Sequence, residues 1–262
     1  MQLEFFSALD TGRARSNNED AVRVDEAIGL AVLADGMGGY NAGEVASAMA
    51  VDCMVDHVAR WVAESRSPRD EAEIRQALTA GASHANRTVF EASQSRAEYA
   101  GMGTTLVVAL FNDARLWVGH IGDSRAYRWR AGRLEQLSRD HSLLQEQIDA
   151  GLLTPEEAVF SMNRNLVTRA VGVEPEVELE IVGHEVQTGD TVLLCSDGLS
   201  DMLPDPAIAQ VMRANDSLAT AAVALIAAAN AAGGRDNISV VLVHAKGGAA
   251  PTGRAWWPFR RA

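Results

Sequence analysis

The stretch LAVLADGMGGYNAGE, residues 30–44, joins an apolar run to a glycine-rich loop and then to a helical pattern. The run 28–34 has the length and apolar content of a buried strand. Asp35 stands where this run stops, and three glycines follow it within four residues. Such a loop could cradle a nucleotide phosphate, make a tight turn or hold a metal ion.

The nucleotide alternative fits the loop poorly. A dinucleotide fingerprint needs glycines at its first, third and sixth positions, and Asn41 occupies the sixth position here. The charge of Asp35 would also face the pyrophosphate, and no Gly-Lys-Ser/Thr follows to make a P-loop. The turn alternative rests on Asp-Gly, a favoured hairpin dipeptide, and would explain a single copy of the pattern.

The pattern occurs more than once, which favours the metal alternative. Asp197-Gly198 follows the apolar run TVLLCS, and Asp236 precedes the apolar run ISVVLV. In an antiparallel sheet the end of one strand lies beside the start of its neighbour, so Asp35, Asp197 and Asp236 are predicted to converge on one sheet edge. Further acids precede apolar or small segments: Glu19 and Asp20 in RSNNED, and Asp123 in GDSRAY.

Several carboxylates at one edge repel one another unless cations separate them. Ligands that are all oxygen suit Mg²⁺ or Mn²⁺ rather than zinc, and glycine beside Asp35 and Asp197 lets the backbone approach an ion. Two such ions could hold a hydroxide for attack on a phosphate ester. Arg15, four residues before Glu19, could bind the phosphate oxygens.

The order of the predicted elements indicates the fold class. Strands followed by helices in separate runs are typical of α+β proteins, in which helices cover antiparallel sheets. Apolar patterns predict strands at 3–9, 21–25, 28–34, 104–111, 115–122, 125–130, 177–183, 191–195 and 238–245. They predict helices at 43–64, from Ser67 to about Gln94, at 142–150, from Thr154, at 207–214 and at 217–231.

A set of motifs in fixed order resembles the metal-dependent protein phosphatases (PPM family, protein phosphatase type 2C), especially their bacterial members. The motifs are RSNNED, ADGMGG, AGEVAS, GTT, GDSRAY, SRDHS, TPEEA, CSDGLSD and GGRDNIS, and they span about residues 1–245. The resemblance implies a four-layer α-β-β-α sandwich with two central antiparallel sheets and a flap at about 141–172. It also implies hydrolysis of phosphoserine and phosphothreonine in proteins by direct attack of a metal-bound hydroxide.

The resemblance implies a role for each acid. Asp35 bridges two metal ions, the carbonyl of Gly36 binds one of them, and Asp197 and Asp236 bind the other. Arg15 binds the substrate phosphate. The further implied roles are Glu19 and Asp20 through metal-bound waters, Asp123 at a third and weaker metal site shared with Asp197, and Asn237 in orienting Asp236.

Three positions depart from the family pattern. Met37 stands where many eukaryotic members have a histidine proposed as general acid, and Tyr40 stands where many bacterial members have histidine. The flap sequence SMNRNLV lacks a histidine that often occurs there, so substrate preference could differ. His120 and His141 are alternative acids, although each is more simply a structural histidine. We expect a metal-bound water to protonate the leaving group.

Composition limits the location and the partners. The 262 residues carry a net charge of -12, which disfavours a nucleic-acid partner. The N-terminal residues lack the basic and apolar pattern of a secretory signal, and the two cysteines suggest no disulfide framework, so we expect a cytoplasmic monomer. The alanine-rich stretch 217–234 approaches membrane-spanning length but is predicted to be a packed, soluble helix.

The expected partners are phosphorylated proteins, together with a cognate Ser/Thr kinase and its targets. Residues 246–262 contain four basic residues and no acid, beside Trp256, Trp257 and Phe259, and are predicted to form a flexible tail. This tail could dock on an anionic membrane or an acidic partner. Two alternative functions are a catalytically inactive phosphoprotein-binding module of the same fold and a phosphatase of small phosphoesters.

Overall fold

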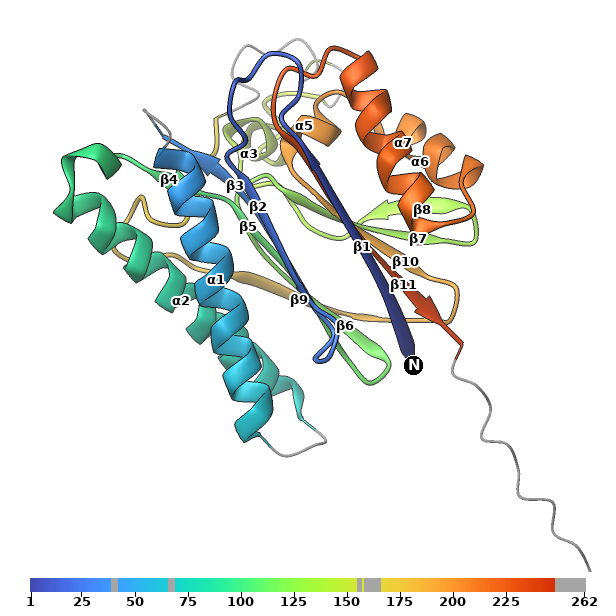
Figure 1. Cartoon of the computed structure of the whole chain (residues 1–262), viewed down its shortest axis with the longest axis horizontal. Helices are drawn as coiled ribbons and strands as arrows, with labels where there is room; N and C mark the ends of the chain where they lie inside the picture. The colour runs from blue at the N-terminus through green and yellow to red at the C-terminus, as the bar shows by residue number, and fades with distance from the viewer. Residues whose placement is uncertain (39–41, 66–68, 155–156, 158–165, 248–262) are drawn as a thin grey trace, which may run out of the picture.

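The computed structural model describes residues 1–38, 42–65, 69–154, 157 and 166–247. These residues form four layers, with two antiparallel sheets between two pairs of helices (Figure 1). Helices α1 (Ala42–Glu64) and α2 (Glu71–Ser95) cover one sheet. Helices α6 (Asp205–Ala214) and α7 (Leu218–Ala231) cover the other. The predicted α-β-β-α sandwich of the α+β class is confirmed.

Each sheet has its own strand order in the described part of the chain. The five-stranded sheet runs β1 (Gln2–Asp10), β11 (Ile238–Lys246), β10 (Thr191–Cys195), β7 (Arg125–Arg130), β8 (Arg133–Gln136). The six-stranded sheet runs β2 (Asp20–Asp25), β3 (Leu30–Met37), β5 (Leu106–Asn112), β6 (Arg115–Ile121), β9 (Glu180–Glu185), with β4 (Gly103–Thr104) beside β3. Among the described residues, the remaining short helical segments are α3 (Leu143–Asp149), α5 (Asp197–Ser200) and the 3-10 turn Ala97–Tyr99.

The apolar run that opens β3 is continuous because both faces of its sheet are covered. Leu30, Val32 and Ala34 pack with α1 and α2, whereas Ala31 and Leu33 pack between the two sheets. All five are fully buried. Burying one large apolar side chain contributes about 1.5–3 kcal/mol, so this alternation stabilises two interfaces at once.

Several predicted boundaries differ from the structure. The strand predicted to end at residue 34 continues to Met37, because β4 pairs with its last residues. The strand predicted at 177–183 is found at Glu180–Glu185, in register with β6. The predicted cap at Ser67 lies outside the described residues, and Asp70 caps α2 by accepting the N–H of Glu73 at 2.8 Å.

Two predictions about helices are confirmed. Thr154 and Glu157 form the predicted capping box: Thr154 Oγ1 accepts the N–H of Glu157 at 3.3 Å, and the Glu157 carboxylate accepts the N–H of Thr154 at 2.9 Å. The alanine-rich stretch 217–234 contains α7, which buries Ala222, Leu225 and Ala229 against the five-stranded sheet. Among the described residues, no helix combines the length and apolarity that crossing a membrane requires.

Candidate active site

The predicted acids meet where the ends of the two sheets come together. Asp20 and Asp35 are direct cross-strand partners in β2 and β3. Asp197 begins α5 just after β10, and Asp236 lies just before β11, in the other sheet. The prediction of a single sheet edge is therefore wrong, because β3 and β10 belong to different sheets. Strand ends that pack face to face bring the two pairs of acids together.

Asp35, Asp197 and Asp236 line a cavity of about 230 Å³. The predicted residues that line it are Arg15, Glu19, Asp35, Gly36, Asp123, Asp197 and Asp236. Met37, Gly38, Thr105 and Val167 complete the described lining. Asp20 is buried beside the cavity, and its Oδ2 accepts a hydrogen bond from Ser196 Oγ at 2.8 Å.

Burial and repulsion from neighbouring carboxylates make the charged form of these carboxyls unfavourable. Burial raises the pKa of Asp20 to about 6, and burial also raises the pKa of Asp123 to about 6, with a further contribution from Asp140. The pKa values of Asp35 and Asp197 are raised well above the ordinary aspartate value, first by burial and then by neighbouring carboxylates. Asp201, for which the sequence predicted no role, contributes to the raised pKa of Asp197.

The donor set fits hard divalent cations. In the described structure Asp20 Oδ1 is buried without a hydrogen-bond partner, in a region where at least four carboxyls have raised pKa values. A cation supplies the positive charge that such a site lacks, and carboxylate oxygens are the ligands that Mg²⁺ and Mn²⁺ prefer. The cavity offers carboxylates and backbone but no thiol or imidazole among its described lining residues, which disfavours zinc.

The glycines after Asp35 and Asp197 permit close packing of backbones. A Cβ on Gly36 would lie 2.1 Å from the carbonyl oxygen of Gly43, at the start of α1. A Cβ on Gly198 would lie 1.9 Å from the carbonyl oxygen of Asn237. Both distances are far below van der Waals contact, so any larger residue would push α1 away from β3 or α5 away from β11. These glycines thus fix the positions of the two neighbouring aspartates.

Hydroxyl groups from the GTT motif hold the backbone of Asp35. Thr105 Oγ1 accepts the N–H of Asp35 at 2.9 Å, and Thr104 Oγ1 donates to its carbonyl oxygen at 2.8 Å. Thr105 Oγ1 is also 2.7 Å from Ser124 Oγ, which connects Asp35 to the loop of Asp123. This motif belongs to the family resemblance, but the sequence predicted no role for it. A threonine pair beside a strand shows no role until the strand that it bonds to is known.

Asn237, just before β11, holds the N-terminal loop between β1 and β2. Its Nδ2 donates to the carbonyl oxygens of Thr11 and Asn17, at 3.0 and 2.8 Å, and its Oδ1 accepts the N–H of Glu19 at 2.8 Å. Its own backbone N–H donates to Asp236 Oδ1 at 2.8 Å. The predicted orienting contact to Asp236 is therefore present, but the backbone makes it, and the amide side chain instead positions the loop that carries Arg15.

Arg15 lies at the rim of the cavity. Its Nη2 is 2.7 Å from Asp236 Oδ2, and its side chain is 51% exposed. The hydrogen bond to Asp236 raises the pKa of Arg15, with smaller contributions from Glu19 and Asp35. A half-exposed guanidinium beside the acids can turn toward an anion that enters the cavity.

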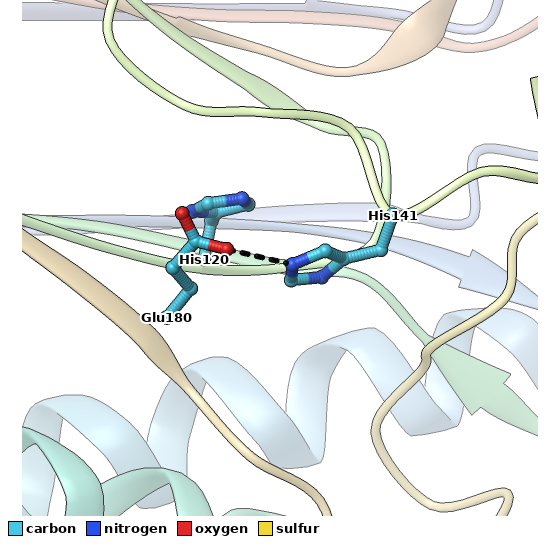
Figure 2. Close-up of side chains that lie close together, drawn as sticks. All are labelled: His120, His141 and Glu180. Carbon is cyan, nitrogen blue, oxygen red and sulfur yellow. Dashed lines mark hydrogen bonds and ion pairs between the residues drawn. The ribbon is translucent and has the colours of Figure 1, made fainter. Parts of the chain in front are cut away.

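The two histidines considered as proton donors do not line the cavity. They stack on each other with ring centroids 4.6 Å apart, beside Glu180 of β9 (Figure 2). His120 Nε2 lies 2.6 Å from the carbonyl oxygen of Arg139, and His141 Nδ1 accepts the N–H of Gly122 at 3.2 Å. Burial lowers the pKa of both imidazoles, so both are neutral near neutral pH. Met37 does line the cavity and has no proton to donate.

The arrangement of this histidine cluster suits holding the backbone in place rather than binding a metal ion. Ligand-type atoms of His120, His141 and Glu180 lie within 4.8 Å of one another. However, His141 uses Nδ1 as an acceptor, so its proton is on Nε2 and is donated to Glu180 at 3.3 Å. The rings are also only 17° from parallel, and one ion cannot lie in the planes of two stacked imidazoles. The cluster instead fixes Gly122, the residue before Asp123.

Substitutions of His141 separate its two nitrogens. His141→Asn keeps an oxygen near the position of Nδ1, whereas His141→Gln places its amide near Nε2. We expect the Gln variant to lose about 1–3 kcal/mol of unfolding free energy beyond the Asn variant, because the buried Gly122 N–H loses its acceptor. Urea denaturation measures the difference, with Glu180→Gln as a control for the more exposed contact. Equal losses of unfolding free energy in the Asn and Gln variants would contradict this role of His141 Nδ1.

The raised carboxyl pKa values predict how pH and cations act on stability. A carboxyl whose pKa is higher in the folded state binds more protons there than in the unfolded chain. The cation-free protein should therefore lose stability as pH rises from about 4 through about 6, the pKa of Asp20. At pH 7.5, saturating Mn²⁺ should raise the melting temperature by about 5–10 °C, and by clearly less at pH 5.

Asp35→Asn provides the matched variant for this melting experiment. Removing one charge relieves repulsion, so the cation-free variant should melt at or above the temperature of the unsubstituted protein at pH 7.5. It should also lose most of the increase that Mn²⁺ produces. A similar Mn²⁺ effect at both pH values, or in the variant, would show that these carboxyls do not bind the cation.

Comparison with known proteins places this geometry among relatives. A family model described as "Protein phosphatase 2C" matches residues 12–232. The serine/threonine phosphatase stp of Listeria monocytogenes is 38% identical over 246 residues, which cover 93% of this chain and 95% of that protein. The crystal structure of the Mycobacterium tuberculosis serine/threonine phosphatase PstP/Ppp is 37% identical, with a TM-score of 0.85 over 94% of this chain and 99% of that one.

A further solved structure contains metal. The catalytic domain of PstP in complex with two manganese ions is 36% identical, with a TM-score of 0.78 over 92% of this chain and 97% of that one. The family model spans the segment from Arg15 to Asp197 and ends before Asp236. The chain therefore belongs to the protein phosphatase 2C family.

Proposed function

We propose that this protein is a Mg²⁺- or Mn²⁺-dependent phosphatase of phosphoserine and phosphothreonine in proteins. The observation that carries the proposal is the convergence of Asp35, Asp123, Asp197 and Asp236 on one cavity, with Arg15 at its rim. Carboxylates so close together need cations, and a cavity that holds cations beside a guanidinium suits a phosphate group. The related PstP structure with two manganese ions supports the same conclusion.

The proposed cation ligands come from both sheets. Asp35 and the carbonyl of Gly36 would bind from the β3 side, and Asp197 and Asp236 from the β10 and β11 side. Asp123 and Asp197 would serve a third, weaker site, and Glu19 and Asp20 would act through water. When bound, such cations neutralise phosphate charge and lower the pKa of a water molecule. The chain's own contribution is to hold these oxygens in place through Thr105, Gly36 and the other contacts described above.

Arg15 is the proposed phosphate-binding residue. In the structure its guanidinium is bonded to Asp236, with 2.7 Å between Nη2 and Oδ2. Cations bound at Asp236 would compete for that carboxylate and leave the guanidinium free to bind two phosphate oxygens. Asn237 fixes the loop that carries Arg15 through its bonds to Thr11 and Asn17, so the guanidinium stays within reach of the cavity.

The lining of the cavity favours direct attack by water. No cysteine, serine or histidine is among its described lining residues, so no side chain of those types can form a phosphoenzyme there. The hydroxyl of Thr105 is already engaged by Asp35 and Ser124. The remaining charged groups among the described lining residues are Arg15 and the carboxylates, and the carboxylates can orient a water molecule toward phosphorus.

The observations favour a protein phosphatase over the two alternative functions. An inactive binding module of the same fold would be expected to lack one of the acids, whereas here every predicted acid is at the cavity or directly beside it. A phosphatase of small phosphoesters would prefer free metabolites over peptides. A panel of phosphopeptides and small phosphoesters, compared by kcat/KM, distinguishes that alternative.

The metal dependence is tested directly by phosphate release. A phosphothreonine peptide should be hydrolysed with Mn²⁺ present, and excess EDTA should abolish the activity. Asp35→Asn should lower kcat by about a thousandfold or more, because water activation by bound cations supplies most of the rate. Asp113→Asn is the matched control and should leave kcat unchanged, because Asp113 is exposed in the turn between β5 and β6 and does not line the cavity. Unchanged rates after chelation would exclude the proposed mechanism.

We also propose partners that follow from this function. The source of the phosphoproteins is a Ser/Thr kinase, since a phosphatase needs a reaction that supplies its substrate; the phosphoproteome of a strain lacking the phosphatase identifies the targets. The predicted phosphatase domain ends at residue 245, and β11 extends one residue further, to Lys246. Residues 248–262 lie outside the described residues, so docking of this tail on a membrane or partner stays a prediction from the sequence.

A further inference from the structure

A second groove adjoins the catalytic cavity. It has a volume of about 330 Å³ and shares Met37 and Val167 with that cavity. Its apolar surface comes mainly from Met37, Val167, Val173 and Val177. Val173 is 50% exposed, so part of this surface is open to solvent. Because the cavity and the groove share these residues, a substrate whose phosphate occupies the catalytic cavity can place a neighbouring side chain in this groove.

One wall of the groove is fixed before any ligand binds. The side chain of Asn86, which is 1% exposed, donates to the carbonyl oxygens of Glu174 and Pro175 at 3.0 and 3.1 Å. The same amide accepts the N–H of Gly172 at 2.7 Å. Gly172 has a φ of +86° and packs so closely on Val89 that no side chain would fit. Binding in this groove therefore requires little ordering of the wall, which favours affinity.

The described lining of this groove carries a net negative charge. Glu174, Glu176 and Glu178 line the groove and are exposed, and none of them forms an ion pair in the described part of the chain. Arg169 also lines the groove, and its Nη1 is 3.3 Å from the backbone carbonyl of Glu178. The groove thus combines an apolar floor with three carboxylates and one guanidinium at its edge.

We propose that this groove binds a lysine or arginine side chain of the substrate, beside the phosphorylated residue. The inference rests on the proposed phosphatase function and adds a preference among its substrates. The aliphatic stem of a lysine or arginine can lie on Val173 and Val177 while its charged end reaches the glutamates. An acidic side chain in the same place would be repelled by them, so the groove discriminates by charge.

The test compares matched phosphothreonine peptides. One set carries arginine at positions on either side of the phosphothreonine, and the other carries glutamine at the same positions. With Mn²⁺ at low salt, the unsubstituted protein should prefer the arginine peptides by about five- to tenfold in kcat/KM. In the variant Glu174→Gln, Glu176→Gln, Glu178→Gln the preference should fall to within about twofold.

A control variant separates the groove from the overall charge of the protein. Glu26→Gln, Glu64→Gln and Asp113→Asn together remove the same three charges at exposed positions outside the groove. This variant should keep the preference for arginine peptides. Hydrolysis of para-nitrophenyl phosphate, which has no cationic group for the glutamates to bind, should be the same for all three proteins and shows that each is folded and active.

The outcomes distinguish the two proposals. Hydrolysis of both peptide sets without a preference for arginine would overturn the groove assignment and leave the phosphatase function intact. Loss of the preference in the control variant as well would also overturn it, because general charge would then be the cause. Absence of Mn²⁺-dependent hydrolysis with every peptide and with para-nitrophenyl phosphate would overturn both.

Discussion

The repulsion among buried carboxylates is the constraint on which the rest of the structure depends. Asp20 and Asp35 are adjacent across two strands, and Asp197 approaches them from the other sheet. Burial alone makes each charge costly, and the neighbours add to the cost. A fold that keeps these groups together must hold them by other contacts, and the resulting cluster of carboxylates suits divalent cations.

Those contacts are supplied by groups beside the acids rather than by the acids themselves. Hydroxyls of Thr104 and Thr105 hold the backbone of Asp35, and Asn237 joins the N-terminal loop to the start of β11. Gly36 and Gly198 let neighbouring backbones approach closely. The hydrophobic layers on both faces of each sheet provide the stability that offsets the repulsion. These contacts therefore hold the backbone around the acids in place, whereas the side chain of Arg15 at the rim is half exposed.

The structure brings the predicted acids to one cavity or beside it. The sequence pointed to them because aspartates at the ends of apolar strands have few structural reasons to recur. It failed where position depends on partners distant in the chain. The strand β3 continues beyond Asp35 because β4, distant in the chain, pairs with its last residues: Gly36 lies opposite Thr104. The prediction of one sheet edge failed because local pattern cannot assign strands to sheets. His120 and His141, which the sequence could suggest as acids, face Glu180 and Gly122 instead of the cavity.

The sequence by itself determined the α+β class, the continuous apolar strands, the order of the motifs and the presence of residue types that suit divalent cations. These follow from local periodicity and from side-chain chemistry, which each segment carries whatever its neighbours are. Only the tertiary structure decided that the acids come from two sheets, that Asn237 positions the loop of Arg15, and that a charged groove adjoins the cavity. Each of those depends on which distant segments pack together, and packing is a property of the whole chain.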